Sequence, residues 1–293
     1  HSFNQFIQVS GDYVYRIDHG DAYPRGIKFT RTDVCDPEFD YENAKDWERD
    51  PDTGDYTYTQ ASRPINKNIK SKILMEFPGK TGQNYTGCEI GGFEMAGDRA
   101  VVVGTSIDYT KGIDSNSATN IFVVTGTIDG TPVVKYLTSY KDPNTQPLLG
   151  APQLVKVSDD KFVVIWDEGH YEEYEVEVYD PYWDYTWTDT YSTIVTTTKY
   201  VAIDSTGKTI SDYYTLDTQV TDCKPVLCSD GFIRWFYNAR LDKKVYDSPV
   251  YTHKAEINAD TLKGSDGITY KFDYENALNL TDEAGVGGFI ERL

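Results

Sequence analysis

Acidic side chains and two histidines recur in polar segments that follow apolar runs of the sequence. Four such segments supply the candidate ligand-binding residues Asp18, His19, Asp21, Arg25, Asp108, Asp167, His170, Asn238 and Arg240. Carboxylate oxygens suit a hard cation such as Ca²⁺, and a histidine beside an aspartate can donate a proton or bind a metal. If the protein is an enzyme, the candidate catalytic residues are Asp18, His19, Asp167 and His170. The competing interpretation is that these polar residues cap turns and tie strands together, because polar loops follow the strands of most β proteins.

The segment 50–55, with the sequence Asp-Pro-Asp-Thr-Gly-Asp, is a separate candidate site for calcium. Asp50, Asp52 and Asp55 are spaced somewhat like the ligands of an oxygen-rich calcium loop. The full ligand spacing and the closing glutamate of such a loop are missing. A plain turn explains the same residues, and calcium is the one cofactor that the sequence suggests.

Aromatic and acidic residues alternate in the segment 168–191. Flat aromatic rings beside carboxylates are what saccharide recognition uses, which makes Trp183 and Trp187 candidate ligand-binding residues, with Tyr182 beside them. The alternation of Glu with Tyr or Val over 174–179 predicts, as the alternative, a two-stranded ribbon whose rings pair across its strands.

The composition argues against several classes of function. The formal net charge of −19 at pH 7 disfavours nucleic acids, whose binding depends on Lys and Arg. It disfavours anionic membrane surfaces as well, and no apolar stretch is long enough to span a bilayer, so that membrane insertion is not expected. The sequence has no G-x-S-x-G elbow, no H-E-x-x-H helix and no phosphate-binding glycine loop. These absences favour binding over catalysis.

The four cysteines are too few for a fold held together by disulfides. Cys35, Cys88, Cys223 and Cys228 allow two bridges in three connectivities. A bridge between Cys223 and Cys228 is disfavoured, because five residues of extended strand separate two Cα atoms by about 16 Å, whereas a disulfide needs less than about 7 Å.

A strand–turn–strand pattern that would position the candidate residues occurs four times. The copies span 6–17, 93–103, 154–166 and 225–236. Ser, Ala, Gly and Asp form the turn of each copy, because these residues supply the positive φ or the side-chain hydrogen bonds of short hairpins. The strand after each turn is almost continuously apolar, which is typical of strands buried on both faces. Further strand patterns follow at 121–124, 133–137, 199–203, 210–214 and 251–257.

Repeated units of four antiparallel strands cannot bury their faces alone, but they can by stacking around an axis. The sequence therefore predicts an all-β fold of the β-propeller type, with four clear blades, or five and more if weaker patterns count. The copies are spaced more widely than the about 40–50 residues of common blade families, so insertions are expected at about 32–69 and 168–191, the second an aromatic hairpin. No linker divides the chain, which predicts one domain over 1–293. The loops after the second strands would then meet on one face.

The apolar strands, their turns at 158–160 and 229–231, and the Ile203-Asp204-x-x-Gly207 hairpin resemble the repeats of bacterial surface-protein β-propellers. The resemblance implies an extracellular or cell-surface binding or adhesion module that holds a carbohydrate or a cell-surface protein on its loop face. Propellers of this kind also include hydrolases and lyases, so a carbohydrate-active enzyme is one alternative. A purely structural segment of a larger surface protein is another.

Overall fold

The computed structural model describes residues 2–20, 25–33, 47–58, 69–77, 88–108, 118–141, 148–220, 224–240, 250–265 and 269–270. These residues form strands and turns, and no helix occurs among them. Within the same residues there is accordingly no helix that is long and apolar enough to cross a membrane.

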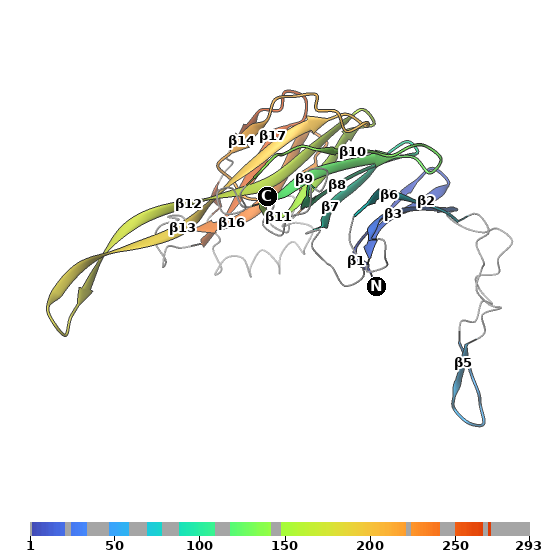
Figure 1. Cartoon of the computed structure of the whole chain (residues 1–293), viewed down its shortest axis with the longest axis horizontal. Helices are drawn as coiled ribbons and strands as arrows, with labels where there is room; N and C mark the ends of the chain where they lie inside the picture. The colour runs from blue at the N-terminus through green and yellow to red at the C-terminus, as the bar shows by residue number, and fades with distance from the viewer. Residues whose placement is uncertain are drawn as a thin grey trace, which may run out of the picture.

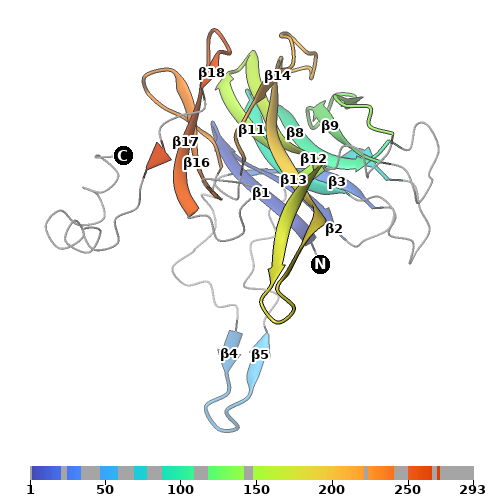
Figure 2. The same ribbon diagram turned by 90° about the vertical axis from the view of Figure 1, so that its left-hand side faces the viewer.

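The strands form four antiparallel sheets that follow one another along the chain (Figures 1 and 2). The first sheet has the order β1 (Ser2–Ser10), β2 (Tyr13–Gly20), β3 (Gly26–Asp33), β6 (Lys70–Glu76). The second sheet contains β7 (Glu89–Ala96), β8 (Arg99–Ile107), β9 (Thr119–Gly126) and β10 (Val133–Tyr136). The third contains β11 (Leu148–Ser158), β12 (Lys161–Asp180), β13 (Tyr185–Ile203) and β14 (Tyr214–Leu216).

The fourth sheet has one strand more than the others. It contains β15 (Val226–Leu227), β16 (Phe232–Arg240), β17 (Val250–Asn258) and β18 (Gly264–Ser265), and β19 (Thr269–Tyr270) also pairs with β17. A separate two-stranded sheet is made by β4 (Trp47–Arg49) and β5 (Tyr56–Tyr58).

The four predicted hairpins are confirmed as the pairs β1–β2, β7–β8, β11–β12 and β15–β16. Glycine occupies the positive-φ position in three of their turns, at Gly11, Gly97 and Gly231. The third turn has no glycine, and there the Ser158 hydroxyl accepts a hydrogen bond from the Asp160 amide at 3.3 Å. Local turn chemistry therefore sets all four hairpins.

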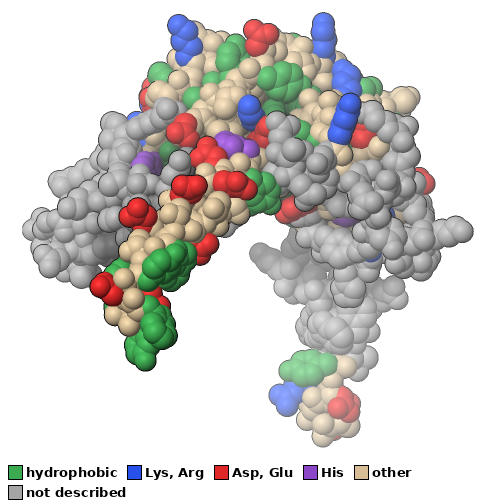
Figure 3. All heavy atoms as spheres, turned by 60° about the vertical axis from the view of Figure 1, so that its left-hand side comes forward, with side chains coloured by type: hydrophobic (Ala, Val, Ile, Leu, Met, Phe, Trp, Pro, Cys, Tyr) green, Lys and Arg blue, Asp and Glu red, His purple; other side chains and the backbone are tan. Residues whose placement is uncertain are grey.

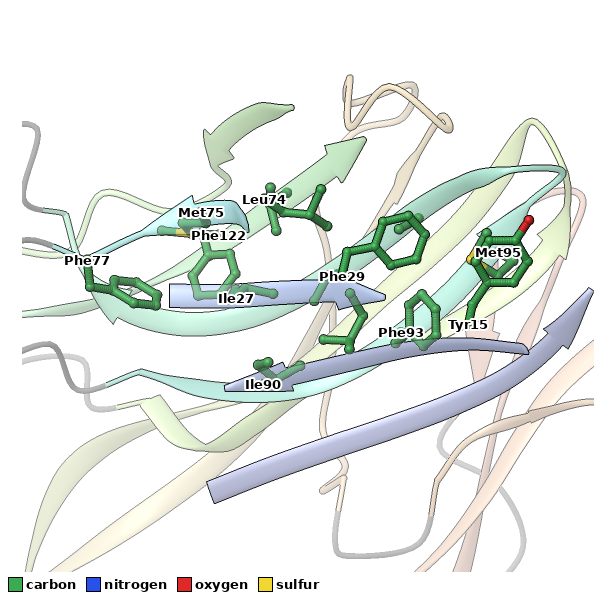
Figure 4. Packing of buried hydrophobic residues seen from close by; sticks show 14 residues of the cluster. Tyr15, Ile27, Phe29, Leu74, Met75, Phe77, Ile90, Phe93, Met95 and Phe122 are labelled. Atoms are coloured by element: carbon green, nitrogen blue, oxygen red, sulfur yellow. The ribbon is translucent and has the colours of Figure 1, made fainter. Parts of the chain in front are cut away.

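The core lies between consecutive sheets, because the second strand of a sheet is apolar on both of its faces. Val102 of β8 packs with the first sheet, in a cluster that includes Phe29 and Phe93 (Figure 4). Its neighbours Val101 and Val103 point the other way, into a cluster with residues of the third sheet. A third cluster joins Val163 and Ile165 of β12 to buried residues of the fourth sheet.

The first strands of the sheets lie next to one another, with β7 between β1 and β11, and β15 beside β11. Two glycines allow the closest of these approaches. A Cβ atom on Gly91 would lie 1.8 Å from the carbonyl oxygen of Pro152, and one on Gly92 would lie 2.5 Å from Cβ of Leu154. Side chains at these positions would force β7 and β11 apart.

The all-β prediction with repeated four-stranded antiparallel sheets is confirmed. The main contacts between strands join each sheet to the next, and none of them joins the first sheet to the fourth among the described residues, so the closed ring of a propeller is not confirmed. The expected hairpin at 168–191 is present as a continuation of β12 and β13, which pair without interruption from Phe162 and Ile203 out to Asp180 and Tyr185. The sequence prediction missed β3 and β6, which complete the first sheet on either side of the 32–69 segment.

Candidate functional site

One pocket of about 610 Å³ lies where the first strands of the sheets come together, and we call it the central pocket. Its lining comes from β1, β7, β11, β12, β13 and the segment that leads into β15. The lining residues are Phe6, Glu89, Ile90, Gly91, Leu149, Gly150, Ala151, Gln153, Asp167, Thr196, Gln219, Val220 and Lys224. Segments that are more than 200 residues apart in the sequence thus share one site.

Irregular strand pairing shapes the wall of the central pocket. The register between β7 and β8 shifts between Ile90 and Gly92, and the register between β11 and β12 shifts between Leu149 and Gln153. Gly150 within the second irregularity has a φ of 78°, which a residue with a side chain rarely adopts. Bulges of this kind bend a strand and redirect its side chains, which opens space at the start of both strands.

Asp167 is the predicted site residue that lines the central pocket, and it is buried. One carboxylate oxygen accepts a hydrogen bond from the Thr198 hydroxyl at 2.9 Å, and the other accepts one from the Val220 amide at 2.7 Å. Burial raises the pKa of Asp167 to about 7, although both hydrogen bonds oppose that rise. The residue ties β12 to β13 and to the chain before β15.

The rest of the pocket wall is mostly uncharged and hydrogen-bonding. Gln153, Thr196 and Gln219 are uncharged polar residues of the lining, and Phe6 is an aromatic one. Two charged residues of opposite sign, Glu89 and Lys224, complete the lining. Such a wall suits a small polar ligand that offers hydroxyl groups and some apolar surface.

Asp18, His19, Arg25 and Asp108 are not among the residues that line the central pocket. Asp18 lies 3.1 Å from Arg16 Nε in a surface ion pair. His19 is buried with its ring edge-on to Phe77 at 5.6 Å, and burial lowers its pKa, with a smaller contribution from Arg25. Arg25 and Asp108 are buried as well. The loops after the second strands of the first two sheets therefore do not place these side chains in the central pocket.

The remaining predicted ligand-binding residues are scattered. His170 lies 3.2 Å from Glu172 on the hairpin that β12 and β13 form, and the exposed Asn238 accepts a hydrogen bond from Thr252 at 2.8 Å. Trp183 and Trp187 lie near the tip of the same hairpin, with Trp183 74% exposed. Asp21 and the side chain of Arg240 lie outside the described residues.

The calcium candidates lie in the turn between β4 and β5. Asp50 Oδ1 accepts hydrogen bonds from the amides of Asp52 at 2.8 Å and Thr53 at 3.2 Å, which lower the pKa of Asp50. Gly54 has a φ of 77° in the same turn. Throughout the described part of the chain, no three His, Cys, Asp or Glu side chains gather closely enough to hold a metal ion. The hydrogen bonds are those of the plain turn that was the alternative interpretation.

Two of the four cysteines are described, and neither forms a disulfide. Cys88 and Cys228 are both half-buried thiols, and burial raises the pKa of Cys88 well above its usual range. Cys35 and Cys223 lie outside the described residues.

Most residues of the central pocket were not predicted, because the predicted site residues come from the expected loops after the second strands, from the segment 50–55 and from the aromatic hairpin. Glu89, Gln153 and Thr196 lie within strands, and Gln219 and Lys224 lie in the connection before β15. One local signal was available. Gly91, Gly92 and Gly150 interrupt strand patterns, and a glycine inside a strand often marks a bulge or a close backbone approach.

The fold and the pocket define, for the described residues, an all-β protein of four antiparallel sheets with a pocket to which strands or adjoining segments of successive sheets contribute. No protein-family model matches the chain, and no curated protein matches it either. Among solved structures, one similar chain is described as a "putative glycoside hydrolase" from Parabacteroides distasonis ATCC 8503. The two share 12% sequence identity with a TM-score of 0.27, and the match covers 94% of this chain and 76% of the other.

Proposed function

We propose that the protein is an extracellular or cell-surface binding module whose four sheets act as blades of a β-propeller, with the ligand held in the central pocket. The observation that carries the proposal is the lining of that pocket, to which β1, β7, β11 and the chain leading into β15 all contribute. A site shared by the innermost strands of successive sheets is where a propeller places its central channel.

The chemistry of the lining favours a carbohydrate as the ligand. The groups of Gln153, Gln219 and Thr196 match the hydroxyl groups of a sugar, and the Phe6 ring matches its apolar face. The net charge of −19 also suits a neutral ligand better than an anionic one.

A glycan array followed by calorimetry on the selected sugar tests this proposal. Gln153→Ala and Gln219→Ala should each weaken binding about tenfold, since losing a buried hydrogen bond costs about 1–2 kcal/mol. Gln5→Ala is the matched control, because Gln5 is an exposed glutamine on β1 and is not part of the pocket lining. The proposal fails if no glycan binds, or if Gln5→Ala weakens binding as much as the pocket variants.

A carbohydrate-active hydrolase is the second candidate, and one observation favours it. Asp167, with its pKa raised to about 7, shares the central pocket with the second carboxylate Glu89. A protonated and an ionised carboxyl group flanking one bond are what glycoside hydrolysis needs. Against this role, both oxygens of Asp167 already accept hydrogen bonds from Thr198 and Val220.

Reducing-sugar release separates the two candidates. A hydrolase should release reducing ends from a bound oligosaccharide, and Asp167→Asn and Glu89→Gln should each abolish the release. A binding module should leave the oligosaccharide intact over days while calorimetry still detects its binding.

A further inference from the structure

The outer part of the hairpin made by β12 and β13 has two chemically different faces. Directly paired residues share a face, and the pairs include Tyr174 with Tyr191, Val178 with Trp187, and Asp180 with Tyr185. Because side chains alternate along a strand, one face, which we call the aromatic face, collects the following residues: Tyr174, Val176, Val178, Tyr185, Trp187 and Tyr191. The opposite face contains Glu173, Glu175, Glu177, Thr186, Thr188 and Thr190, and its one ring in this part of the hairpin is Tyr179, whose hydroxyl donates a hydrogen bond to Asp184.

Several side chains of the aromatic face are exposed, with Tyr185 at 61%, Tyr191 at 45% and Trp187 at 37%. The last pair between β12 and β11 is Glu168 with Leu148, and β14 pairs with β13 only at Thr198, Lys199 and Tyr200. Beyond these points the hairpin is two strands wide, and it projects from the body of the molecule (Figures 1 and 2). A two-stranded hairpin with an apolar face is marginally stable in water and gains from a partner.

The negative charge of the hairpin favours a positively charged partner. Residues 171–191 contain seven Asp and Glu and no Lys or Arg. Figure 3 shows the acidic side chains along the projecting hairpin and the apolar ones gathered toward its tip. A second copy of the chain would bring two such negative surfaces together, and an anionic membrane would be repelled in the same way.

Rings and carboxylates alternate on the aromatic face itself. Asp180 is paired directly with Tyr185, and Asp189 lies on the same face, two residues from Trp187 and two from Tyr191. The rings of Tyr185 and Trp187 are stacked, with centroids 6.2 Å apart, and those of Tyr174 and Tyr191 are stacked at 6.1 Å. An aromatic ring with a carboxylate beside it binds a guanidinium or ammonium group by cation–π and ionic attraction together.

We propose that the aromatic face of the β12–β13 hairpin is a docking surface for a protein segment in which Arg or Lys alternates with apolar residues. The apolar side chains of the partner pack on Val176 and Val178, and its cations lie over the rings beside Asp180 and Asp189. An extended segment can also pair with an open edge of the hairpin, which adds backbone hydrogen bonds. The aromatic face is separate from the central pocket, so this proposal can be tested independently of the proposed function.

The probe is a synthetic peptide of alternating Arg and Val, and its matched control carries citrulline, the uncharged isostere, in place of Arg. Binding is measured by calorimetry at physiological salt and by the change in tryptophan fluorescence, to which the exposed Trp183 and Trp187 contribute. The citrulline peptide should bind at least about tenfold more weakly, because ion pairing and most of the cation–π attraction are lost.

Matched variants on the two faces locate the binding. Tyr191→Thr and Asp189→Asn change the aromatic face, while Tyr171→Thr and Glu175→Gln make the same chemical changes on the other face. Tyr191 and Tyr171 are similarly exposed, at 45% and 54%, so that the tyrosine pair is closely matched. The first two variants should weaken binding at least about fivefold and the other two less than about twofold.

Four outcomes would overturn the proposal. The first is that the Arg peptide does not bind, and the second is that both peptides bind equally. The third is that variants on the two faces weaken binding equally, which would mean unspecific attraction to a negative surface. The fourth is that Tyr191→Thr instead abolishes binding to an oligosaccharide or dissolves a dimer seen in sedimentation. Thermal melting of each variant confirms that the body of the protein remains folded.

Discussion

Lys224 Nζ lies 3.0 Å from Glu94 Oε1, although the two residues are 130 positions apart in the sequence. Glu94 is on β7, and its other carboxylate oxygen accepts a hydrogen bond from Gln8 Nε2 of β1 at 2.7 Å. The same Gln8 amide donates to the Phe93 carbonyl at 2.9 Å and accepts from the Met95 amide at 3.0 Å. This small network joins the first sheet, the second sheet and the chain entering the fourth.

Gln8 should matter more to stability than the ion pair beside it. Gln8→Leu removes the partners of the Phe93 carbonyl and the Met95 amide on β7, which should lower the free energy of unfolding by about 1–3 kcal/mol. Lys224→Met should cost less than about 1 kcal/mol, because Lys224 is half exposed and its ion pair is screened by water. Urea denaturation of both variants measures the difference, and equal losses would contradict the assignment.

Gly91→Ala should strongly destabilise the contact between the second and third sheets. The added Cβ atom meets the Pro152 carbonyl oxygen, which is backbone and cannot swing aside, so we expect a loss of about 3 kcal/mol or more. Gly11→Ala is the control. It also introduces a methyl group, but no atom lies within 4 Å of it and its cost, about 1–2 kcal/mol, comes only from the positive φ of 58°. A smaller loss for Gly91→Ala than for Gly11→Ala would show that β7 and β11 are not in close contact.

Asp167 should make the protein less stable as the pH rises toward neutrality. In the unfolded chain its carboxyl group has the ordinary aspartate pKa of 3.8, and burial raises this pKa to about 7 in the fold. Between these values the folded state holds a proton that the unfolded state has released. The stabilisation is therefore complete below about pH 4 and is lost as the pH rises to about 7, with a total change on the order of a few kcal/mol.

The variant Asp167→Asn tests this linkage. An Asn amide can accept from the Val220 amide and donate to the Thr198 hydroxyl, as a protonated Asp would, and it does not titrate. The difference in unfolding free energy between wild type and variant should change steadily from about pH 4 to about pH 7. A difference that is independent of pH would contradict the raised pKa.

The turn between β4 and β5 should form without calcium. Asp50 already holds the amides of Asp52 and Thr53, so the chemical shifts of residues 50–55 should not respond to millimolar calcium or to its removal by a chelator. In the same NMR experiment, Asp50→Ala should disturb the pairing of Trp47 with Tyr58, whereas Asp52→Ala should not. Saturable shifts at Asp52 and Asp55 on adding calcium would instead support a metal site.

The local sequence was enough to predict the hairpins but not all the strands that complete each sheet. The turn at Gly231 and the apolar strand from Phe232 depend only on neighbouring residues, so both could be predicted from the local sequence. β3 pairs with β6 across the 32–69 segment, as Ile27 and Met75 show, and a pairing between segments so far apart cannot be predicted from either segment alone. The hairpin at 168–191 was predictable because its alternation repeats over many residues.

By itself, then, the sequence determined an all-β protein with four tight hairpins, doubly buried second strands and a projecting aromatic hairpin. These features follow from φ preferences, side-chain alternation and hydrophobicity, which act over a few residues. Only the tertiary structure decided which polar groups meet. It brought Asp167 to Val220 and into a pocket with Glu89 and Lys224, and it left His19 packed against Phe77 elsewhere. The reason is that the meeting of distant groups depends on how sheets stack, and close approaches such as that of Gly91 to Pro152 set that stacking.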